Sequence, residues 1–253
     1  MKLLQLLEKR FGSKVHHFTA VKDNFLYLYP EKLEQYNQPH CDKCTLCEAH
    51  IYRQDLPFWA GPHAHKKLMV VAQDAGKGYE ENSVNTVFSI HVAILNTEKY
   101  FEASPRHKRY FELFKGMFYD TDFLNHIYFT DIIKCAYSTE NKFKVSDINC
   151  ADDLFVEMEA VNPGALLLMG TAAQSVFINL MGLHGHKLHF IHQFNCAINN
   201  RSSIKFQHYD YNGRAVFFVP HLIGNLHISK AKKDSFNEFV VSIQHYIKNL
   251  LHD

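Results

Sequence analysis

The feature that most constrains the fold is an unbroken apolar run at residues 68–72, which ends abruptly in polar residues and glycine. Such a short run, bounded by a turn, is typical of a strand buried on both faces in a parallel sheet. Gln73 and Asp74 close the run, and Gly76 permits a tight turn after it. Open α/β sheets place their sites at the ends of such strands. From this segment alone we favour the ordinary alternative, a loop in which Asp74 caps the next helix.

Strand-like and helix-like segments alternate along the rest of the chain. Buried strands are expected at residues 67–73, 127–134, 165–169 and 215–219, edge strands at 187–194 and 204–209, and helices at 147–161, after Gly170 and at 231–251. Asn212-Gly213 is a hairpin signal, and Ser146 is the expected N-cap of the first of these helices. The alternation predicts a three-layer α/β/α sandwich with a mainly parallel central four-stranded sheet.

The size and composition of the chain favour one large core. With 253 residues and 47% hydrophobic content, we expect a single main domain with an appendage rather than two domains. The expected division is an N-terminal helical and aromatic extension over residues 1–38, followed by a domain over 39–253.

Charge and apolar patterning exclude several classes. The net charge of +1 gives no overall attraction to nucleic acid, so any basic surface must be local. No apolar run approaches the length of a membrane span. The N-terminal MKLLQLLEKRF lacks a small-residue cleavage site, so we expect a cytoplasmic protein.

The cysteines indicate a metal site. Disulfides are disfavoured without a secretory signal, whereas Cys41 and Cys44 have the Cys-x-x-Cys spacing that holds one metal or one edge of a cluster. Cys135 closes an expected strand and Cys150 opens an expected helix, so both can meet at one edge of the sheet. Zinc and an iron–sulfur cluster both accept four thiolates, and the spacing does not choose between them.

Five motifs in order resemble the iron–sulfur (family 4-like) branch of the uracil-DNA glycosylase superfamily, as a divergent member. The resemblance runs from about residue 41 to the C-terminus. The motifs are Cys-x-x-Cys-x-Leu from Cys41, VVAQDAG from Val70, FTDIIKCAYS from Phe129, NPGALLLMGTAAQ from Asn162 after the fourth cysteine, and VPHLIGNLH from Val219.

The resemblance implies a cofactor, a partner and an activity. It implies a 4Fe–4S cluster, rather than zinc, on Cys41, Cys44, Cys135 and Cys150, with Cys47 as a packing residue or an alternative ligand. It also implies a monomeric, DNA-binding glycosylase that hydrolyses the N-glycosidic bond of a flipped-out base.

Three residues suit the chemistry of that reaction. A carboxylate beneath the sugar stabilises the developing cation or activates water, which suits Asp74. A donor near the base carbonyl stabilises the leaving anion, which suits His221. Gln73 and Asp74 resemble the Gln-Asp pair of the superfamily's first family, whereas iron–sulfur members often carry Glu-Ala there. A helix cap and a hydrogen-bonded strand-end histidine are the alternatives, and the ordered motifs favour catalysis.

Contacts to DNA are expected from several other segments. Leu226 or Ile228 suits the apolar wedge that replaces a flipped base, or else covers the core. Phe88, or Val87 in a shifted alignment, suits stacking on that base. The candidate phosphate contacts, or alternatively members of a solvated charged face, are Lys230, Arg106 and Arg109.

The base itself is indicated by Asp131. Uracil-specific members end this strand in Thr-Asn, where this chain has Thr130 and Asp131. An ionised carboxylate only accepts hydrogen bonds, so it pairs with the exocyclic amino group of cytosine better than with uracil O4. Gly76 stands where some members use Tyr to exclude groups at C5 of the base.

We therefore expect release of a C5-modified cytosine, as in defence against phage with hypermodified DNA. One alternative is a uracil repair glycosylase in which Asp131 is protonated. The other is a non-catalytic iron–sulfur protein that binds nucleic acid.

Overall fold

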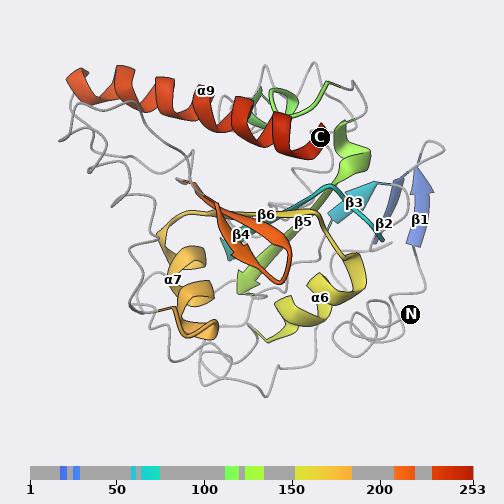
Figure 1. The fold of residues 1–253 in the computed structure, drawn as a ribbon. Helices are drawn as coiled ribbons and strands as arrows, with labels where there is room; N and C mark the ends of the chain where they lie inside the picture. Colours follow the sequence, from blue (N-terminus) through green and yellow to red (C-terminus); the bar gives the residue numbers. More distant parts are fainter. Residues whose placement is uncertain are drawn as a thin grey trace, which may run out of the picture.

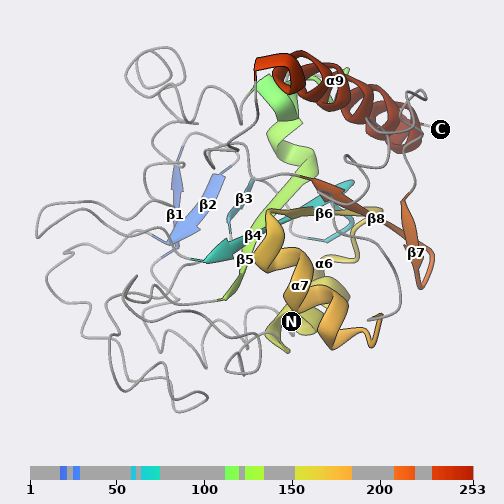
Figure 2. The ribbon, with the colours of Figure 1, turned by 90° about the vertical axis from the view of Figure 1, so that its left-hand side faces the viewer.

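The computed structural model of the chain describes residues 18–21, 25–28, 58–60, 64–74, 112–119, 123–133, 152–183, 208–219 and 230–252. A sheet lies between two layers of helices in these ranges (Figures 1 and 2). Helices α6 (Asp153–Val161) and α7 (Thr171–Leu180) cover one face, and the long helix α9 (Lys230–His252) covers the other.

The sheet has eight strands in the order β1-β2-β3-β5-β4-β6-β8-β7. Their bounds are β1 Phe18–Val21, β2 Phe25–Leu28, β3 Phe58–Ala60, β4 Leu68–Asp74, β5 Ile127–Ile133, β6 Ala165–Met169, β7 Tyr209–Tyr211 and β8 Arg214–Val219. The pairs β5–β4, β4–β6 and β6–β8 are parallel. The predicted fold class is therefore confirmed, and antiparallel strands extend the predicted core of four parallel strands on both sides.

The central strands form where the sequence is apolar without alternation. All five residues of β6 are buried, and Leu68 to Val71 in β4 are at most 2% exposed. Helices on both faces of a parallel sheet remove the polar alternation that a half-solvated strand would show. Each of the four parallel strands begins and ends within one residue of its predicted bounds.

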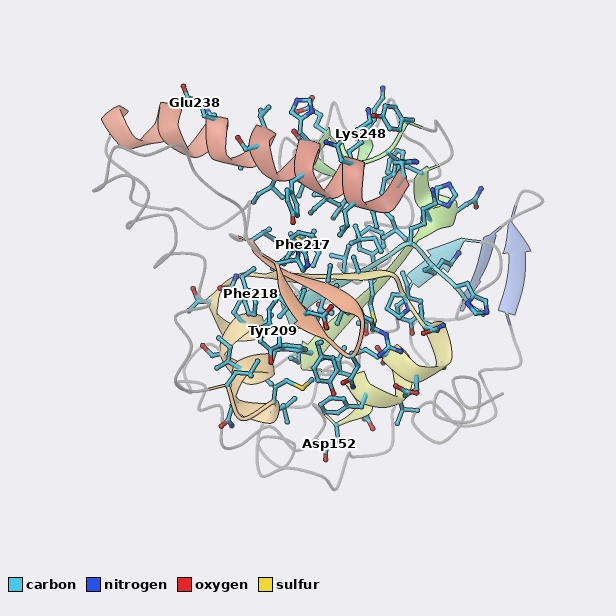
Figure 3. The ribbon with its side chains drawn as sticks, viewed as in Figure 1. Asp152, Tyr209, Phe217, Phe218, Glu238 and Lys248 are labelled. Carbon is cyan, nitrogen blue, oxygen red and sulfur yellow. The ribbon has the colours of Figure 1, made fainter. Side chains whose placement is uncertain are left out.

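Neighbouring residues of β8 show the two faces of the sheet. The ring of Phe217 lies 5.9 Å from that of Tyr246 in α9, whereas the ring of Phe218 lies 6.4 Å from that of Phe177 in α7. Figure 3 shows the two labelled phenylalanine side chains on opposite sides of the strand. Residues of one parity along each central strand therefore face α9, and residues of the other parity face α7.

Helix α6 begins later than the sequence pattern predicts. Its first residue is Asp153 and its N-cap is Asp152, so the predicted start at residue 147 with Ser146 as cap is wrong. Asp153 is 5% exposed and stands in the first turn of the helix. An acidic side chain at that position is stabilised by the partial positive charge of the helix N-terminus, a stronger start signal than the apolar spacing upstream.

The hairpin between β7 and β8 has the predicted turn. Asn212 has φ of 51° and Gly213 has φ of 75°, as a type I′ turn requires at both central positions. The amide of Gly213 donates a hydrogen bond to Oδ1 of Asp210 at 3.2 Å. At the other side of the sheet, β1 and β2 within residues 18–28 continue the sheet through β3.

Helix α9 packs closely on the segment 112–119. The side-chain amide of Gln244 donates to the carbonyl oxygens of Glu112 and Leu113, both at 3.1 Å. A Cβ atom on Gly116 would lie 2.4 Å from that amide nitrogen, so glycine permits the approach. No helix within the described ranges is long and apolar enough to span a membrane.

The loop before β4 contains a buried lysine. Lys66 is 3% exposed, and its Nζ donates to the carbonyl oxygen of Asn125 at 2.7 Å. Desolvation disfavours the charged ammonium and lowers the pKa of Lys66 from 10.5 to about 8. In the unfolded chain the ordinary pKa returns, so the unfolded state binds more protons between these two values. The stability contributed by Lys66 therefore rises with pH from about 8 to 10.5.

Replacing Lys66 by Met should remove this pH dependence. We expect the free energy of unfolding of the wild type to gain about 2–3 kcal/mol relative to Lys66→Met as the pH rises from about 7 to about 10. Urea unfolding at several pH values measures the difference. Lys67→Met is the matched control for loss of a positive charge from the same loop. A constant difference between wild type and Lys66→Met across this range would contradict the assignment.

Candidate active site

The four central parallel strands end at one edge of the sheet, the carboxyl edge. Strand β5 lies on one side of β4, and β6 and β8 lie on the other. The chain therefore reverses its direction of winding between β4 and β6. This is the topological switch point at which open α/β sheets bind ligands.

Two acidic residues occupy neighbouring positions at this edge. Asp131 of β5 pairs with Ala72 of β4, and Asp74 pairs with Ile133. The Cα atoms at positions 74 and 131 are therefore one strand spacing and two residues apart, or about 8 Å. The register thus places the predicted catalytic and base-binding positions at the same part of the edge.

Asp131 lies on the face of the sheet that α9 covers. Two residues earlier, the ring of Phe129 lies 5.1 Å from that of Phe114, in the segment that Gln244 of α9 binds. Because side chains alternate along a strand, Asp131 faces the same layer. Its side chain is half-buried, so part of it remains open to solvent or to a ligand at the carboxyl edge.

A glycine turn joins β6 to α7 at the same edge. Gly170 has φ of 85° and ψ of 160°, a combination that only glycine adopts without strain. The turn allows α7 to begin at Thr171, immediately after β6. The amide of Gly170 donates to the carbonyl oxygen of Val219 at 3.0 Å and so joins the turn to the end of β8.

Gln174 in the first turns of α7 links the ends of β6 and β8. Its side chain is 2% exposed, and its Nε2 donates to the carbonyl oxygens of Leu168 at 3.2 Å and Val219 at 2.7 Å. From the sequence, this glutamine is identified only as part of the motif that begins at Asn162, with no role of its own. A signal was present, since Gln174 stands in the buried apolar stripe of α7 beside Ala173, Val176 and Phe177, where an unpaired amide would be costly.

The structure places some of the predicted residues and not others. Gln73 and Asp74 are the last two residues of β4 and Lys230 is the first of α9; their side chains are not among those described. The remaining predicted site residues lie outside the described residues: His221, Phe88, Gly76, Leu226, Ile228, Arg106, Arg109, Cys41, Cys44, Cys135 and Cys150. His221 follows the end of β8 by two residues, and Cys135 follows the end of β5 by two.

The arrangement suits chemistry that develops positive charge. Acidic residues at two nearby positions of one edge attract a cation and disfavour a further anion. Within the described ranges, no group of three or more His, Cys, Asp or Glu side chains could hold a metal ion.

Comparison with known families gives a match at the level of a superfamily. The model of the Uracil DNA glycosylase superfamily matches residues 58–243, well over half of the chain. The matched range contains all four parallel strands, both α6 and α7, and more than half of α9. No curated protein matches the chain.

Proposed function

Because the chain belongs to the uracil-DNA glycosylase superfamily, a superfamily of DNA glycosylases, we propose that it is a monofunctional enzyme that releases a C5-modified cytosine from DNA. The observation that carries this proposal is the placement of Asp131 beside position 74 at the carboxyl edge. In this proposal, Asp74 stabilises the positive charge on the sugar, and Asp131 accepts a hydrogen bond from the base.

Asp74 is the proposed catalytic carboxylate. Breaking the N-glycosidic bond leaves positive charge on the sugar and negative charge on the departing base. A carboxylate beneath the sugar stabilises that cation or orients the attacking water. The position of Asp74 at the end of a central strand supports this role, since the strand holds its backbone against β5 and β6. Gln73 precedes it, and His221 is the proposed donor to the leaving base.

Asp131 is the proposed specificity residue. The exocyclic amino group of cytosine donates a hydrogen bond, whereas O4 of uracil only accepts one. An ionised Asp131 therefore favours cytosine, while an asparagine amide at the same position would pair with uracil. Gly76 leaves space for a substituent at C5, and Phe88 is the proposed stacking partner of the base. A marked cytosine fits a role in defence against phage with hypermodified DNA.

Binding to DNA requires contacts around the extruded base. Leu226 or Ile228 is the proposed wedge, and Lys230, Arg106 and Arg109 are the proposed phosphate contacts. The direction of α9 supports the assignment of Lys230. Near the other end of the helix, His252 lies 3.5 Å from Nζ of Lys67, just before β4, so α9 begins on the side of the carboxyl edge (Figure 1).

The second candidate is a uracil repair glycosylase. It is favoured by the superfamily match, which does not distinguish the released base. In that enzyme Asp131 would have to be protonated, so that its hydroxyl could donate to uracil O4. Substrate preference at neutral pH therefore separates the two candidates.

We further propose that Cys41, Cys44, Cys135 and Cys150 bind a 4Fe–4S cluster. Support comes from the four-thiolate composition and from the position of Cys135 two residues after β5. Such a cluster would connect the segment after β5 to the segment that precedes α6. Zinc is the alternative ion for four thiolates. No step of base release is assigned to the cluster.

Replacing Asp74 by Asn should slow catalysis strongly and leave DNA binding intact. We expect the rate of base release to fall about 100- to 1,000-fold, because charge stabilisation in the transition state is lost. Single-turnover assays and binding to the same duplex measure the two effects. Asp152→Asn, at the exposed N-cap of α6, is the control (Figure 3). An unchanged rate in Asp74→Asn would exclude the catalytic role, and binding without release in the wild type would indicate a non-catalytic protein.

Replacing Asp131 by Asn should change the base that is released. We expect the ratio of 5-hydroxymethylcytosine release to uracil release to fall about 10- to 100-fold, the effect of exchanging one hydrogen-bond acceptor for a donor. Competition assays with both bases in equimolar duplexes measure the ratio, and Asp152→Asn again serves as the control. The same ratio in wild type and variant would show that Asp131 does not read the base.

Removing one proposed ligand should remove the cluster. Protein purified without oxygen should contain iron and acid-labile sulfide in equal amounts and should absorb visible light. We expect Cys135→Ser to lose the iron, the sulfide and the visible absorption, because the substitution removes one of the four thiolates that a 4Fe–4S cluster requires. Cys196→Ser is the control, since it removes a thiol outside the proposed set. Stoichiometric zinc with no iron in the wild type would contradict the proposal.

A further inference from the structure

The two hydrogen bonds of Gln174 connect residues that are distant in sequence. Its Nε2 donates to Leu168 near the end of β6 and to Val219 at the end of β8. These carbonyls belong to strands that pair directly, with Leu168 opposite Phe218. The amide therefore bridges two neighbouring strands at the carboxyl edge, where regular ladder hydrogen bonds end.

The orientation of this amide is determined by its partners. Both partners are carbonyl oxygens, which only accept hydrogen bonds, so the nitrogen of the amide must face them. The side chain is 2% exposed, and water does not compete freely for the same carbonyls. Neither an aliphatic side chain nor an ionised carboxylate of the same size could make these bonds.

The carbonyl oxygen of Val219 accepts two hydrogen bonds from the turn and helix that follow β6. It accepts from Nε2 of Gln174 at 2.7 Å and from the amide of Gly170 at 3.0 Å, so both lone pairs are used. The next residue is Pro220, which has no amide hydrogen to continue the ladder and a restricted φ. Both hydrogen bonds therefore act on the last residue of β8.

We propose that Gln174 is a positioning residue for base release, acting through the segment that begins at the end of β8. This inference rests on the proposed function, because the residue that it positions, His221, is the proposed donor to the leaving base. His221 follows Val219 by two residues. Loss of the Gln174 amide leaves the carbonyl oxygen of Val219 with one of its two described donors, the amide of Gly170. We expect the end of β8 to shift as a result and to displace the donor from the base.

The chain offers a matched control in Gln244. This glutamine also donates from Nε2 to two backbone carbonyls, those of Glu112 and Leu113. Its contact joins α9 to the segment 112–119, in the helical layer on one face of the sheet and not at the ends of β6 and β8. Gln174→Met and Gln244→Met therefore remove the same number and kind of hydrogen bonds at two different places.

The test is single-turnover base release combined with a double-mutant cycle. We expect Gln174→Met to lower the rate about 10- to 100-fold with DNA affinity unchanged, as a small displacement of a catalytic group does. Gln244→Met should retain the wild-type rate. In a His221→Ala background, Gln174→Met should lower the rate less than about twofold further, because residues that act as a unit are not additive. Rate losses that multiply in the double variant would overturn the proposal, as would a wild-type rate in Gln174→Met.

A second readout separates this inference from the proposed activity. In protein with isotope-labelled histidine, the His221 imidazole signal is identified by its absence from His221→Ala. We expect Gln174→Met to shift that signal and Gln244→Met to leave it in place, even if the wild type releases no base. An unshifted signal in Gln174→Met would overturn the positioning role. Gln174→Ala, which removes the amide without burying a charge, replaces Gln174→Met if that variant does not fold. Failure of both to fold would assign Gln174 a structural role only.

Discussion

The geometry of the candidate site depends on the parallel pairing of β4 with β5 and with β6. That ladder sets Ala72 opposite Asp131 and Asp74 opposite Ile133, and it holds β6 against the other side of β4. A slip of one residue would turn every side chain of β4 to the opposite face. Burial of the apolar runs on both faces makes such a slip costly, so the core that stabilises the fold also fixes the spacing of the two acidic positions.

The central strands could be predicted from the sequence, whereas the contacts between them could not. Apolar runs without alternation mark β4, β6 and β8 because helices cover both faces. The predicted start of α6 is wrong. Apolar residues at helical spacing continue upstream of Asp153, but α6 begins at Asp153. The bonds of Gln174 join residues 6 and 45 positions apart, and no local pattern specifies such partners. Asp131 was identified from the sequence, but its distance from position 74 required the register.

Two groups of residues at the carboxyl edge have different proposed roles. Positions 74 and 131 on adjacent strands carry the proposed charge stabilisation and base selection, whereas Gly170 and Gln174, between β6 and α7, determine how the neighbouring strand ends. The proposed reaction thus depends on buried backbone carbonyls as well as on the side chains that contact DNA. Variants in the second group test the geometry of the site without altering its chemistry.

The most direct test of the central claim is base release by the wild-type protein. Duplexes and single strands carrying uracil, cytosine, 5-hydroxymethylcytosine or its glucosylated form would be incubated with the enzyme, and abasic sites would be revealed by alkali. We expect release of a modified cytosine, with uracil and unmodified cytosine retained. Release of uracil alone would contradict this expectation, because an ionised Asp131 next to position 74 would then not be selecting the base.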